Sequence, residues 1–389
     1  MRKIKVFDTT LRDGQQASGA NMTISQKVEI AKLLEKLKVD IIEVGFPISS
    51  NKEFKSVSTI SKTIKDSKVC SLARHNFKDV DCCIEAMKYS KNKRLHLFIA
   101  TSPIHMKYKL NIKPHDILEA IKNIMQYSRN KIDDIEWSCE DGTRSDQNFI
   151  IKCFETAIKY GARTINIADT VGYTTPFEMS KLIKSIFNKT KGIEKATLSI
   201  HCHNDLGLAT SNSLQSILSG ANQVECTING LGERAGNAAL EEIVMALRTR
   251  ADFFKCKTQI DSKLIMKISN LVARNSGFVV NRNKPIVGKN AFAHESGIHQ
   301  HGVLQKRETY EVMDPKDVGQ SSSIITLGSH SGLKGIKHKL DIYKINYKNV
   351  NLKDFCIFFK NKVKNLKIVD KGLFLNLFAE FKKNNIYKK

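Results

Sequence analysis

Two histidines two residues apart follow a β-branched run, in the segment LSIHCHNDLGL at 198–208. Successive residues of a strand point to opposite faces, so His201 and His203 share one face while Cys202 points to the other. Two imidazoles on one face can bind a single metal ion. The carboxylate of Asp13, in TTLRDGQQ, would complete a set of two histidines and one carboxylate.

Such a set leaves coordination positions open. Imidazole and carboxylate ligands suit Mn²⁺, Mg²⁺, Zn²⁺ or Fe(II), and an ion with an open position can polarise a bound carbonyl. Strand geometry favours Asn229, which opens the Gly-rich segment NGLGERAGN at 229–237, as a further ligand. The same segment can also be interpreted as a turn before a helix, with backbone N–H groups that bind an anion.

Other polar residues offer acid–base or anion-binding chemistry. HESGIHQH at 294–301 does not match the H-E-x-x-H zinc motif, but it places three imidazoles on an expected loop, where a general base could lie. Arg12 and Arg74 could bind a substrate carboxylate, or they could be solvated surface charges.

These side chains need elements that bring them together. Helical patterns, with apolar residues at i, i+3, i+4 and i+7, separate eight β-branched runs in the first 250 residues. The runs are 4–10, 39–46, 68–74, 94–101, 133–140, 162–170, 196–203 and 222–229. This alternation predicts an α/β protein with a (β/α)8 TIM barrel, and a doubly wound open sheet is the structural alternative.

In a closed barrel, residues that follow the strands converge on one mouth. The polar residues expected there are Asp8, Arg12, Asp13, Glu43, Arg74, His96, Thr101, Ser138, Glu140, Asp169, Thr170, His201, His203 and Asn229. After about residue 255 the pattern changes to longer helical stretches. We therefore expect a catalytic barrel at 1–255 and a mainly helical C-terminal region at 256–389.

Composition narrows the class of protein. The 389 residues carry a formal net charge of +24, but the lysines are scattered and form no basic helix or aromatic-interleaved patch, so we expect no nucleic-acid partner. An excess of positive charge would still attract a phosphate-bearing ligand. Nine cysteines without a C-x-x-C pair indicate reduced thiols. Because there is no signal-like start and no 18-residue apolar run, we expect a cytoplasmic protein with no membrane partner.

Eight segments carry a resemblance that runs from about residue 3 to residue 345. They are FDTTLRDGQQ, EVGFP, FIATSP, SCEDGTRSD, NIADTVGYTTP, HCHNDLGLA, NGLGERAGN and AFAHESGIHQHGVL. With them the chain resembles the bacterial 2-isopropylmalate synthases, within the family of metal-dependent barrel enzymes that includes homocitrate and citramalate synthases and hydroxymethylglutaryl-CoA lyases. The resemblance implies an acyltransferase that condenses acetyl-CoA with 2-oxoisovalerate and hydrolyses the thioester, the first committed step of leucine biosynthesis.

The resemblance also implies a set of site residues and partners. The metal ligands would be Asp13, His201, His203 and Asn237, so that Asn237 replaces Asn229. The ion would be Mn²⁺, with Mg²⁺ or Zn²⁺ as alternatives and K⁺ as an activator. The pocket for the 2-oxo acid would be lined by His96, Ser138 and Thr170. The catalytic residues would be Arg12, Glu140 and His299.

In this family, Arg12 would stabilise the oxygen of the 2-oxo acid and Glu140 would lie beside the reacting carbons. His299 would come from the partner subunit of a swapped homodimer and help to enolise acetyl-CoA. Relatives that respond to leucine carry a further C-terminal domain, and we expect this chain to lack it and not to sense leucine through its own sequence.

Several other functions remain open on the sequence. A citramalate or homocitrate synthase would use another 2-oxo acid in the same pocket. The lyase branch uses a cysteine in the Gly-rich loop, and 229–237 contains none. An iron(II) oxygenase could use the same two-histidine, one-carboxylate set. A non-enzymatic remnant is the last alternative, and the intact catalytic positions argue against it.

Overall fold

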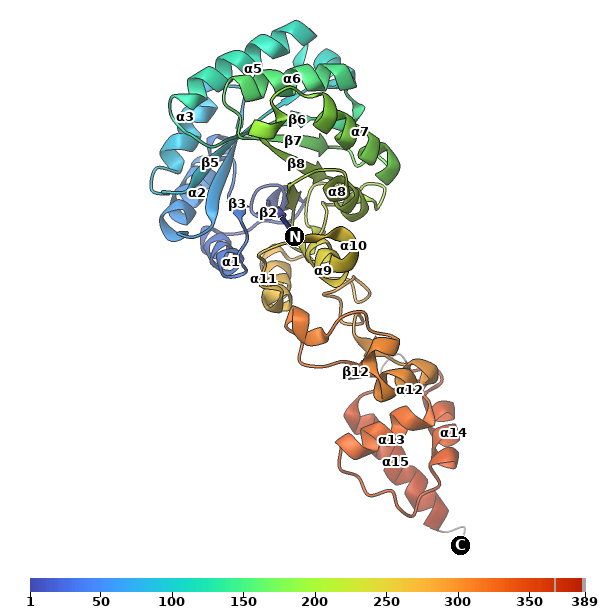
Figure 1. Cartoon of the computed structure of the whole chain (residues 1–389). Helices are drawn as coiled ribbons and strands as arrows, with labels where there is room; N and C mark the ends of the chain where they lie inside the picture. Colours follow the sequence, from blue (N-terminus) through green and yellow to red (C-terminus); the bar gives the residue numbers. More distant parts are fainter. Residues whose placement is uncertain (367–368, 387–389) are drawn as a thin grey trace. The chain divides into compact units, whose positions relative to one another are not determined.

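The computed structural model describes residues 1–366 and 369–386 (Figure 1). The chain divides into two compact units, Met1–Val280 and the residues from Asn281 onward. Each unit is described by itself.

The first unit is a closed barrel of eight parallel strands. They are β2 (Lys5–Asp8), β3 (Ile41–Glu43), β4 (Lys68–Arg74), β5 (Lys93–Ala100), β6 (Ile135–Glu140), β7 (Thr164–Asp169), β8 (Thr197–Cys202) and β9 (Gln223–Cys226). Neighbours in sequence pair in parallel, and β9 closes the barrel on β2, with Val6 opposite Val224. Each predicted run overlaps one of these strands, so the predicted barrel is confirmed.

Helices surround the strands, as Figure 1 shows. They are α1 (Ile24–Lys36), α2 (Asn51–Thr63), α3 (Phe77–Ala86), α5 (Pro114–Arg129), α6 (Gln147–Lys159), α7 (Pro176–Lys189), α8 (Ala209–Leu218) and α9 (Leu240–Thr249). Side chains of Thr23, Ser50, Asn76 and Asp146 cap the first turns of α1, α2, α3 and α6. Such caps satisfy N–H groups that have no partner inside the helix.

The strands alternate between an apolar outer face and a polar inner face. On β6, Trp137 is fully buried against Phe154 of α6, at 5.7 Å between ring centroids, while the neighbouring Glu136 and Ser138 point inward. Barrel interiors are usually filled by branched aliphatic residues. Several inward positions of this barrel are polar instead, and they bond to one another.

Three strands supply this polar layer, which we define as Arg94 of β5, Glu136 of β6 and Gln223 of β9. Arg94 Nη1 donates to Glu136 Oε2 at 2.8 Å and to Gln223 Oε1 at 2.9 Å. Gln223 Nε2 donates to Glu136 Oε1 at 2.8 Å. All three residues are buried, so the hydrogen bonds compensate the cost of removing them from water.

The first unit extends beyond the expected boundary after residue 255. Helix α10 (Ala251–Phe254) is followed by β10 (Cys256–Lys257), which pairs with β1 (Arg2–Lys3), and then by α11 (Ile265–Ser276). Helix α11 packs against α1 and against the turn Ile228–Gly230 after β9. The two compact units therefore divide after Val280, because α11 completes the barrel's helical layer.

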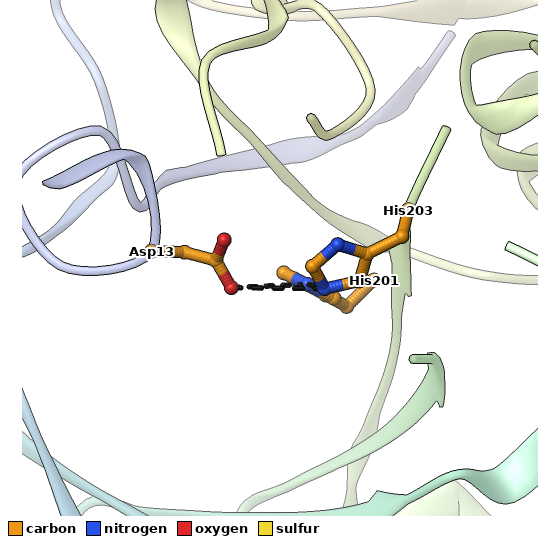
Figure 2. A group of neighbouring side chains, drawn as sticks. All are labelled: Asp13, His201 and His203. Atoms are coloured by element: carbon orange, nitrogen blue, oxygen red, sulfur yellow. Dashed lines mark hydrogen bonds and ion pairs between the residues drawn. The ribbon is translucent and has the colours of Figure 1, made fainter. Parts of the chain in front are cut away.

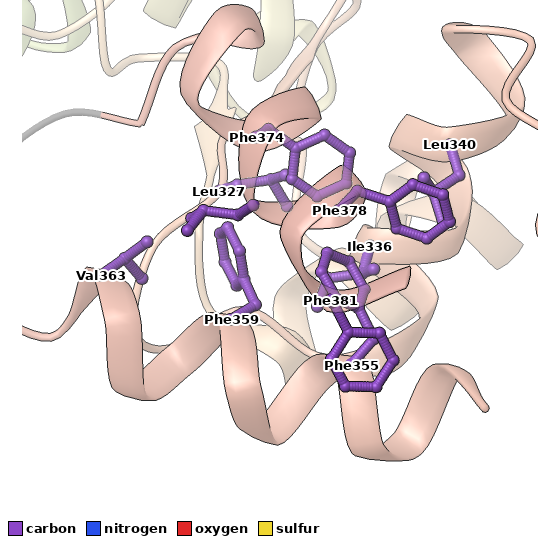
Figure 3. Packing of buried hydrophobic residues seen from close by; sticks show 10 residues of the cluster. Leu327, Ile336, Leu340, Phe355, Phe359, Val363, Phe374, Phe378 and Phe381 are labelled. Carbon is purple, nitrogen blue, oxygen red and sulfur yellow. The ribbon is translucent and has the colours of Figure 1, made fainter. Parts of the chain in front are cut away.

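The second unit is mainly helical, as predicted. It contains β11 (Ala293–His294) and β12 (Ile324–Ile325), which pair in parallel, and the helices α12 (Gly297–Gln305), α13 (Leu333–Ile342), α14 (Leu352–Val363) and α15 (Lys371–Ile386). Helices α13 to α15 enclose an apolar core, in which Phe355 of α14 packs against Phe374 and Phe378 of α15 (Figure 3). The burial of these rings holds the three helices together.

All nine cysteines are unpaired, as their pattern predicted, and most of them are buried. Among the described residues, no helix is both long and apolar enough to span a membrane.

Candidate metal centre and active site

Three buried side chains point toward one another at the mouth of the barrel (Figure 2). Asp13 lies in the loop after β2, and His201 and His203 lie at the end of β8. Nε2 of His201 is 3.6 Å, and Nε2 of His203 is 3.7 Å, from the same oxygen, Oδ2 of Asp13. The two Nε2 atoms are 3.0 Å apart.

These separations fit a shared metal ion. Ligand atoms at about 2.1 Å from one ion, with angles of roughly 90–120° between them, lie about 3.0–3.6 Å apart. Burial lowers the pKa of each histidine to about 4, so both rings are neutral near pH 7 and offer lone pairs. Burial alone would raise the pKa of Asp13, but Arg12, His201 and His203 outweigh it and lower the pKa well below its usual value. Two neutral imidazoles and one ionised carboxylate are the protonation states that bind a cation.

Asn237 joins this group through the Gly-rich loop. Residues 203 and 237 form an antiparallel bridge, and Asn237 Nδ2 donates to Asp13 Oδ1 at 2.8 Å. Its Oδ1 is buried and has no hydrogen-bond partner among the described residues, as expected of an atom placed to bind a cation. The loop makes this approach because Gly232 has no side chain: a Cβ there would overlap the amide of Asn237.

The strand-based expectation for Asn229 is wrong. Asn229 has a left-handed backbone (φ 62°), and its Nδ2 donates to the carbonyl of Ser269 on α11 at 3.0 Å. Its Oδ1 accepts a hydrogen bond from the Ser269 hydroxyl at 2.5 Å. The turn directs this side chain to α11, away from the metal group, so sequence proximity to the strand end was misleading.

A chain of hydrogen bonds leads from the metal group across the barrel interior. Arg12 Nη1 donates to Asp13 Oδ2 at 2.9 Å and its Nε donates to Glu43 Oε2 at 2.6 Å. Glu43 Oε1 is 2.7 Å from Nδ1 of His96, whose Nε2 is 2.5 Å from the Ser138 hydroxyl. The interior therefore fixes Arg12, His96 and Ser138 relative to Asp13.

The buried carboxylate of Glu43 controls the charge of this chain. Burial lowers the pKa of His96, but the carboxylate outweighs it and raises that pKa above its usual value. Burial would raise the pKa of Glu43, yet Arg12 and His96 lower it to about 2. Glu43, Cys70 and His96 also lie close enough together to hold an ion. Because Arg12 already neutralises Glu43, we assign no metal to that second group.

A cavity of about 290 Å³ opens above the metal group. The expected site residues that line it are Arg12, Asp13, His96, Ser138, Glu140, Thr170, His201 and His203. Within it, Glu140 accepts a hydrogen bond from Lys109 Nζ at 2.5 Å. The Thr170 hydroxyl accepts from the backbone N–H of Asp141 at 2.9 Å. Arg74 is not part of the cavity; its guanidinium is exposed and pairs with Asp79 at 2.7 Å.

Several lining residues were missed by the sequence analysis. Asn166 donates to the Ser138 hydroxyl at 2.9 Å, and Glu225 lies 2.9 Å from Nδ1 of His201. Lys109 reaches the cavity from the connection between β5 and α5, and Glu233 and Arg234 reach it from the Gly-rich loop. The signal for Glu225 was available: QVEC places two polar side chains on the same face of a core strand, and in a closed barrel that face must be the interior.

His299 lies in the second unit, on helix α12 and not on the expected loop. Its ring stacks on Tyr310, with centroids 4.1 Å apart and planes at 26°. The neighbouring His294 is held by Glu311, at 3.0 Å between Nε2 and Oε1. The three imidazoles of this segment therefore have different surroundings.

Comparisons with known proteins agree with this geometry. Residues 3–272 match the HMGL-like family model, and residues 286–367 match the model for the domain that follows it in homocitrate synthase. The 2-isopropylmalate synthase of Aquifex aeolicus is 51% identical over 98% of this chain and 74% of its own length. The chain belongs to the 2-isopropylmalate synthase family.

Other 2-isopropylmalate synthases give similar values. That of Caulobacter vibrioides is 52% identical over 87% of this chain and 64% of its own length. That of Pyrococcus furiosus is 51% identical over 90% and 70%. The chain therefore spans between about two thirds and three quarters of the length of these 2-isopropylmalate synthases.

Solved structures support the barrel of this 2-isopropylmalate synthase family member. Hydroxymethylglutaryl-CoA lyase from Pseudomonas aeruginosa superposes with a TM-score of 0.61 at 20% identity, over 72% of this chain and 95% of the lyase. Pyruvate carboxylase from Rhizobium etli gives 0.58 at 17% identity, over 80% of this chain and 32% of the carboxylase. At these identities the likeness concerns the fold alone. Within that fold, Asp13, His201 and His203 form a buried metal-binding group.

Proposed function

We propose that this chain condenses acetyl-CoA with 2-oxoisovalerate and hydrolyses the thioester, yielding 2-isopropylmalate and CoA in the first committed step of leucine biosynthesis. One observation carries the proposal: a chain about half identical to 2-isopropylmalate synthases has the buried group Asp13, His201 and His203 beneath a polar cavity at the barrel mouth.

The residues that would hold the ion are Asp13, His201, His203 and Asn237. Mn²⁺ is the expected ion, Mg²⁺ and Zn²⁺ are the alternatives, and K⁺ would act as an activator. A divalent cation bound there would withdraw electron density from the carbonyl of the 2-oxo acid. The Oδ1 atom of Asn237 is buried and has no hydrogen-bond partner among the described residues, which supports Asn237 as a metal ligand.

The chain's own residues would bind and orient the 2-oxo acid. Arg12 is held by Asp13 and Glu43, so its guanidinium can stabilise the negative charge that develops on the substrate oxygen. His96 lines the same cavity, where Glu43 and the Ser138 hydroxyl fix the orientation of its ring beside the substrate. Ser138 and Thr170 line the same cavity and would fix the position of the acid.

The condensation needs a base and a hydrolysis step. A base removes a proton from the methyl group of acetyl-CoA, and the enolate carbon then forms a bond to C2 of the 2-oxo acid. The C2 oxygen takes the electron pair and then a proton. Water next cleaves the C–S bond, which releases CoA as the thiol. We place Glu140 beside the reacting carbons. We assign to His299, supplied by the partner subunit of a homodimer, a role in the enolisation of acetyl-CoA.

A thiol-release assay tests this function. The purified chain is given acetyl-CoA and Mn²⁺ with 2-oxoisovalerate, pyruvate or 2-oxoglutarate in separate reactions. We expect CoA release to be fastest with 2-oxoisovalerate and to stop when a chelator removes the metal. Faster release with pyruvate or 2-oxoglutarate would assign the chain to the citramalate or homocitrate synthases, and oxygen consumption without CoA release would exclude acyl transfer.

Metal binding by Asp13, His201 and His203 can be tested without measuring catalysis. A ligand that binds only the folded state raises its melting temperature, so Mn²⁺ should stabilise the wild-type chain. Asp13→Asn should lose this shift, whereas Asp116→Asn, which changes a carboxylate at the start of α5, should keep it. An equal shift in both variants would remove Asp13 from the ligand set.

A further inference from the structure

The first unit has a second cavity, of about 640 Å³. Its walls come from the connection between β5 and α5, at 101–114, and from the first turn of α6. The catalytic cavity uses the same connection, from which it takes Lys109. The second cavity takes Met106 and Lys107. One π-helical turn, Met106–Leu110, therefore borders both cavities.

The shape of this turn is well defined. The backbone N–H of Asn111, a residue with a left-handed backbone (φ 51°), donates to the carbonyl of Met106 and closes the turn. The N–H of Ile112 also donates to that carbonyl, at 3.1 Å. Single π-helical turns are rare and occur frequently at functional sites.

The second cavity combines an apolar floor with a positively charged rim. Pro103, Met106 and Phe149 form part of its apolar lining. Lys107 and Lys113 contribute exposed ammonium groups. Among the described residues neither forms an ion pair, whereas the ammonium group of Lys109 is already bound by Glu140. An apolar floor suits a flat aromatic base, and unpaired lysines suit phosphates.

The size of the catalytic cavity decides which substrate needs this second space. At about 290 Å³ it lies at the lower limit for small-molecule sites, which hold roughly 300–1,000 Å³. It can hold 2-oxoisovalerate and an acetyl group, but not a whole acetyl-CoA molecule. The nucleotide end of acetyl-CoA must therefore lie outside it. That end carries an adenine base and several phosphates, the chemistry that the second cavity offers.

We propose that the second cavity binds the 3′-phosphoadenosine diphosphate end of acetyl-CoA. The pantetheine chain then crosses the turn Met106–Leu110 and delivers the acetyl group to the catalytic cavity. Tyr108, whose side chain is among the most exposed aromatic groups of the chain, lies on that turn beside this path. This assignment rests on the proposed function, because it takes acetyl-CoA as the substrate.

Equilibrium binding tests the assignment without turnover. Adenosine 3′,5′-bisphosphate and CoA are each titrated into the full chain in a calorimeter. The double variant Lys107→Ala/Lys113→Ala should bind both probes roughly 10- to 100-fold more weakly than the wild type. The double variant Lys107→Arg/Lys113→Arg keeps the charge and should retain most of the affinity. The control Lys32→Ala/Lys36→Ala removes two exposed lysines of α1 that line another cavity, and should bind as the wild type does.

Kinetics separate this assignment from the proposed function. The Lys107→Ala/Lys113→Ala variant should raise KM for acetyl-CoA, with KM for 2-oxoisovalerate and for acetyl-pantetheine, which lacks the nucleotide, unchanged. Wild-type affinity and KM in this variant would overturn the assignment and leave the proposed function intact. Absence of CoA release from the wild type would overturn the proposed function.

A free nucleotide is the competing occupant. ATP that binds at these lysines more tightly than CoA, without displacing it, would overturn the assignment to acetyl-CoA. Displacement of bound CoA by adenosine 3′,5′-bisphosphate would support it.

Discussion

The carboxylate oxygen Oε2 of Glu225 lies 2.9 Å from Nδ1 of His201, while the other ring nitrogen of His201 faces Asp13. When Glu225 is ionised it only accepts hydrogen bonds, so Nδ1 carries the hydrogen and Nε2 keeps its lone pair for a metal. Burial raises the pKa of Glu225, and a cation at Nε2 would favour its ionised form. Glu225 thus sets both the orientation and the tautomer of His201.

Removing this carboxylate should weaken metal binding although every ligand remains. We expect Glu225→Leu to lower Mn²⁺ affinity roughly 10- to 100-fold, and Glu225→Gln, which keeps an acceptor, to lower it less. Competition with a chromophoric chelator measures both. Asp8→Asn is the control, because Asp8 is an equally buried carboxyl that accepts hydrogen bonds from Thr10 and is not part of the metal group. Wild-type affinity in Glu225→Leu would refute the positioning role.

A methyl group at Gly232 should disturb the metal group from the backbone side. The added Cβ would overlap the Asn237 amide and lie 3.1 Å from Asp13 Oδ1. We expect Gly232→Ala to lower Mn²⁺ affinity, and also to lower the melting temperature of the metal-free chain, because the displaced Asn237 amide loses its hydrogen bonds to Asp13 and Leu231. Gly372→Ala, where the Cβ meets only ordinary contact, is the control. Equal affinities in the two variants would contradict the close-approach argument.

Replacing His299 should affect turnover and not metal content. If His299 assists enolisation, His299→Ala should lower kcat roughly 10²- to 10⁴-fold with Mn²⁺ binding intact. The matched variant is His301→Ala, two residues later on the same helix, which should keep its turnover. Steady-state CoA release and metal analysis of both variants provide the comparison, and an unchanged rate in His299→Ala would remove His299 from the chemistry.

Acid should destabilise the barrel through His75. Trp137 Nε1 donates to Nε2 of His75 at 2.9 Å, and burial lowers the pKa of His75 from 6.5 to about 3. The unfolded chain takes up this proton near pH 6.5 and the folded chain does not, so stability is lost as the pH falls from about 6.5 to about 3. Between about pH 7 and pH 5 the contribution of His75 to this loss should be about 2 kcal/mol, and His75→Gln should reduce the loss by that amount.

Urea unfolding at the two pH values, followed by the fluorescence of the single tryptophan, measures this difference. His115→Gln changes a histidine whose side chain is 74% exposed and should show the wild-type pH dependence. Parallel losses in His75→Gln and the wild type would show that the barrel does not depend on a neutral His75.

The barrel was predictable because its signals are local. Each strand is a short β-branched run and each helix has a 3.6-residue apolar period, so the eight units could be counted. Once the barrel closes, Asp13, His201 and His203 must meet at its mouth, although 188 positions separate the first two. Their chemistry follows from residue type and strand parity alone.

The remaining features depend on backbone turns that the sequence does not display. Asn229 turns away because its backbone is left-handed, while Asn237 reaches Asp13 through a loop that three glycines allow. Glu225 and Asn166 were overlooked because polar residues inside a strand are usually assumed to face water. The first unit extends to Val280 and not to the expected residue 255, because α11 packs on α1. This tertiary contact has no marker in the sequence.

The polar layer of Arg94, Glu136 and Gln223 limits how this barrel can change over evolutionary time. Each member is hydrogen-bonded to the other two in the buried interior, so a single replacement would leave a buried charge or amide without one of its partners. Such losses are strongly non-additive among residues in contact. Substitution at these positions therefore requires simultaneous changes on three strands that lie far apart in the chain. The sequence of the interior beneath the metal group should thus diverge more slowly than that of the surrounding helices.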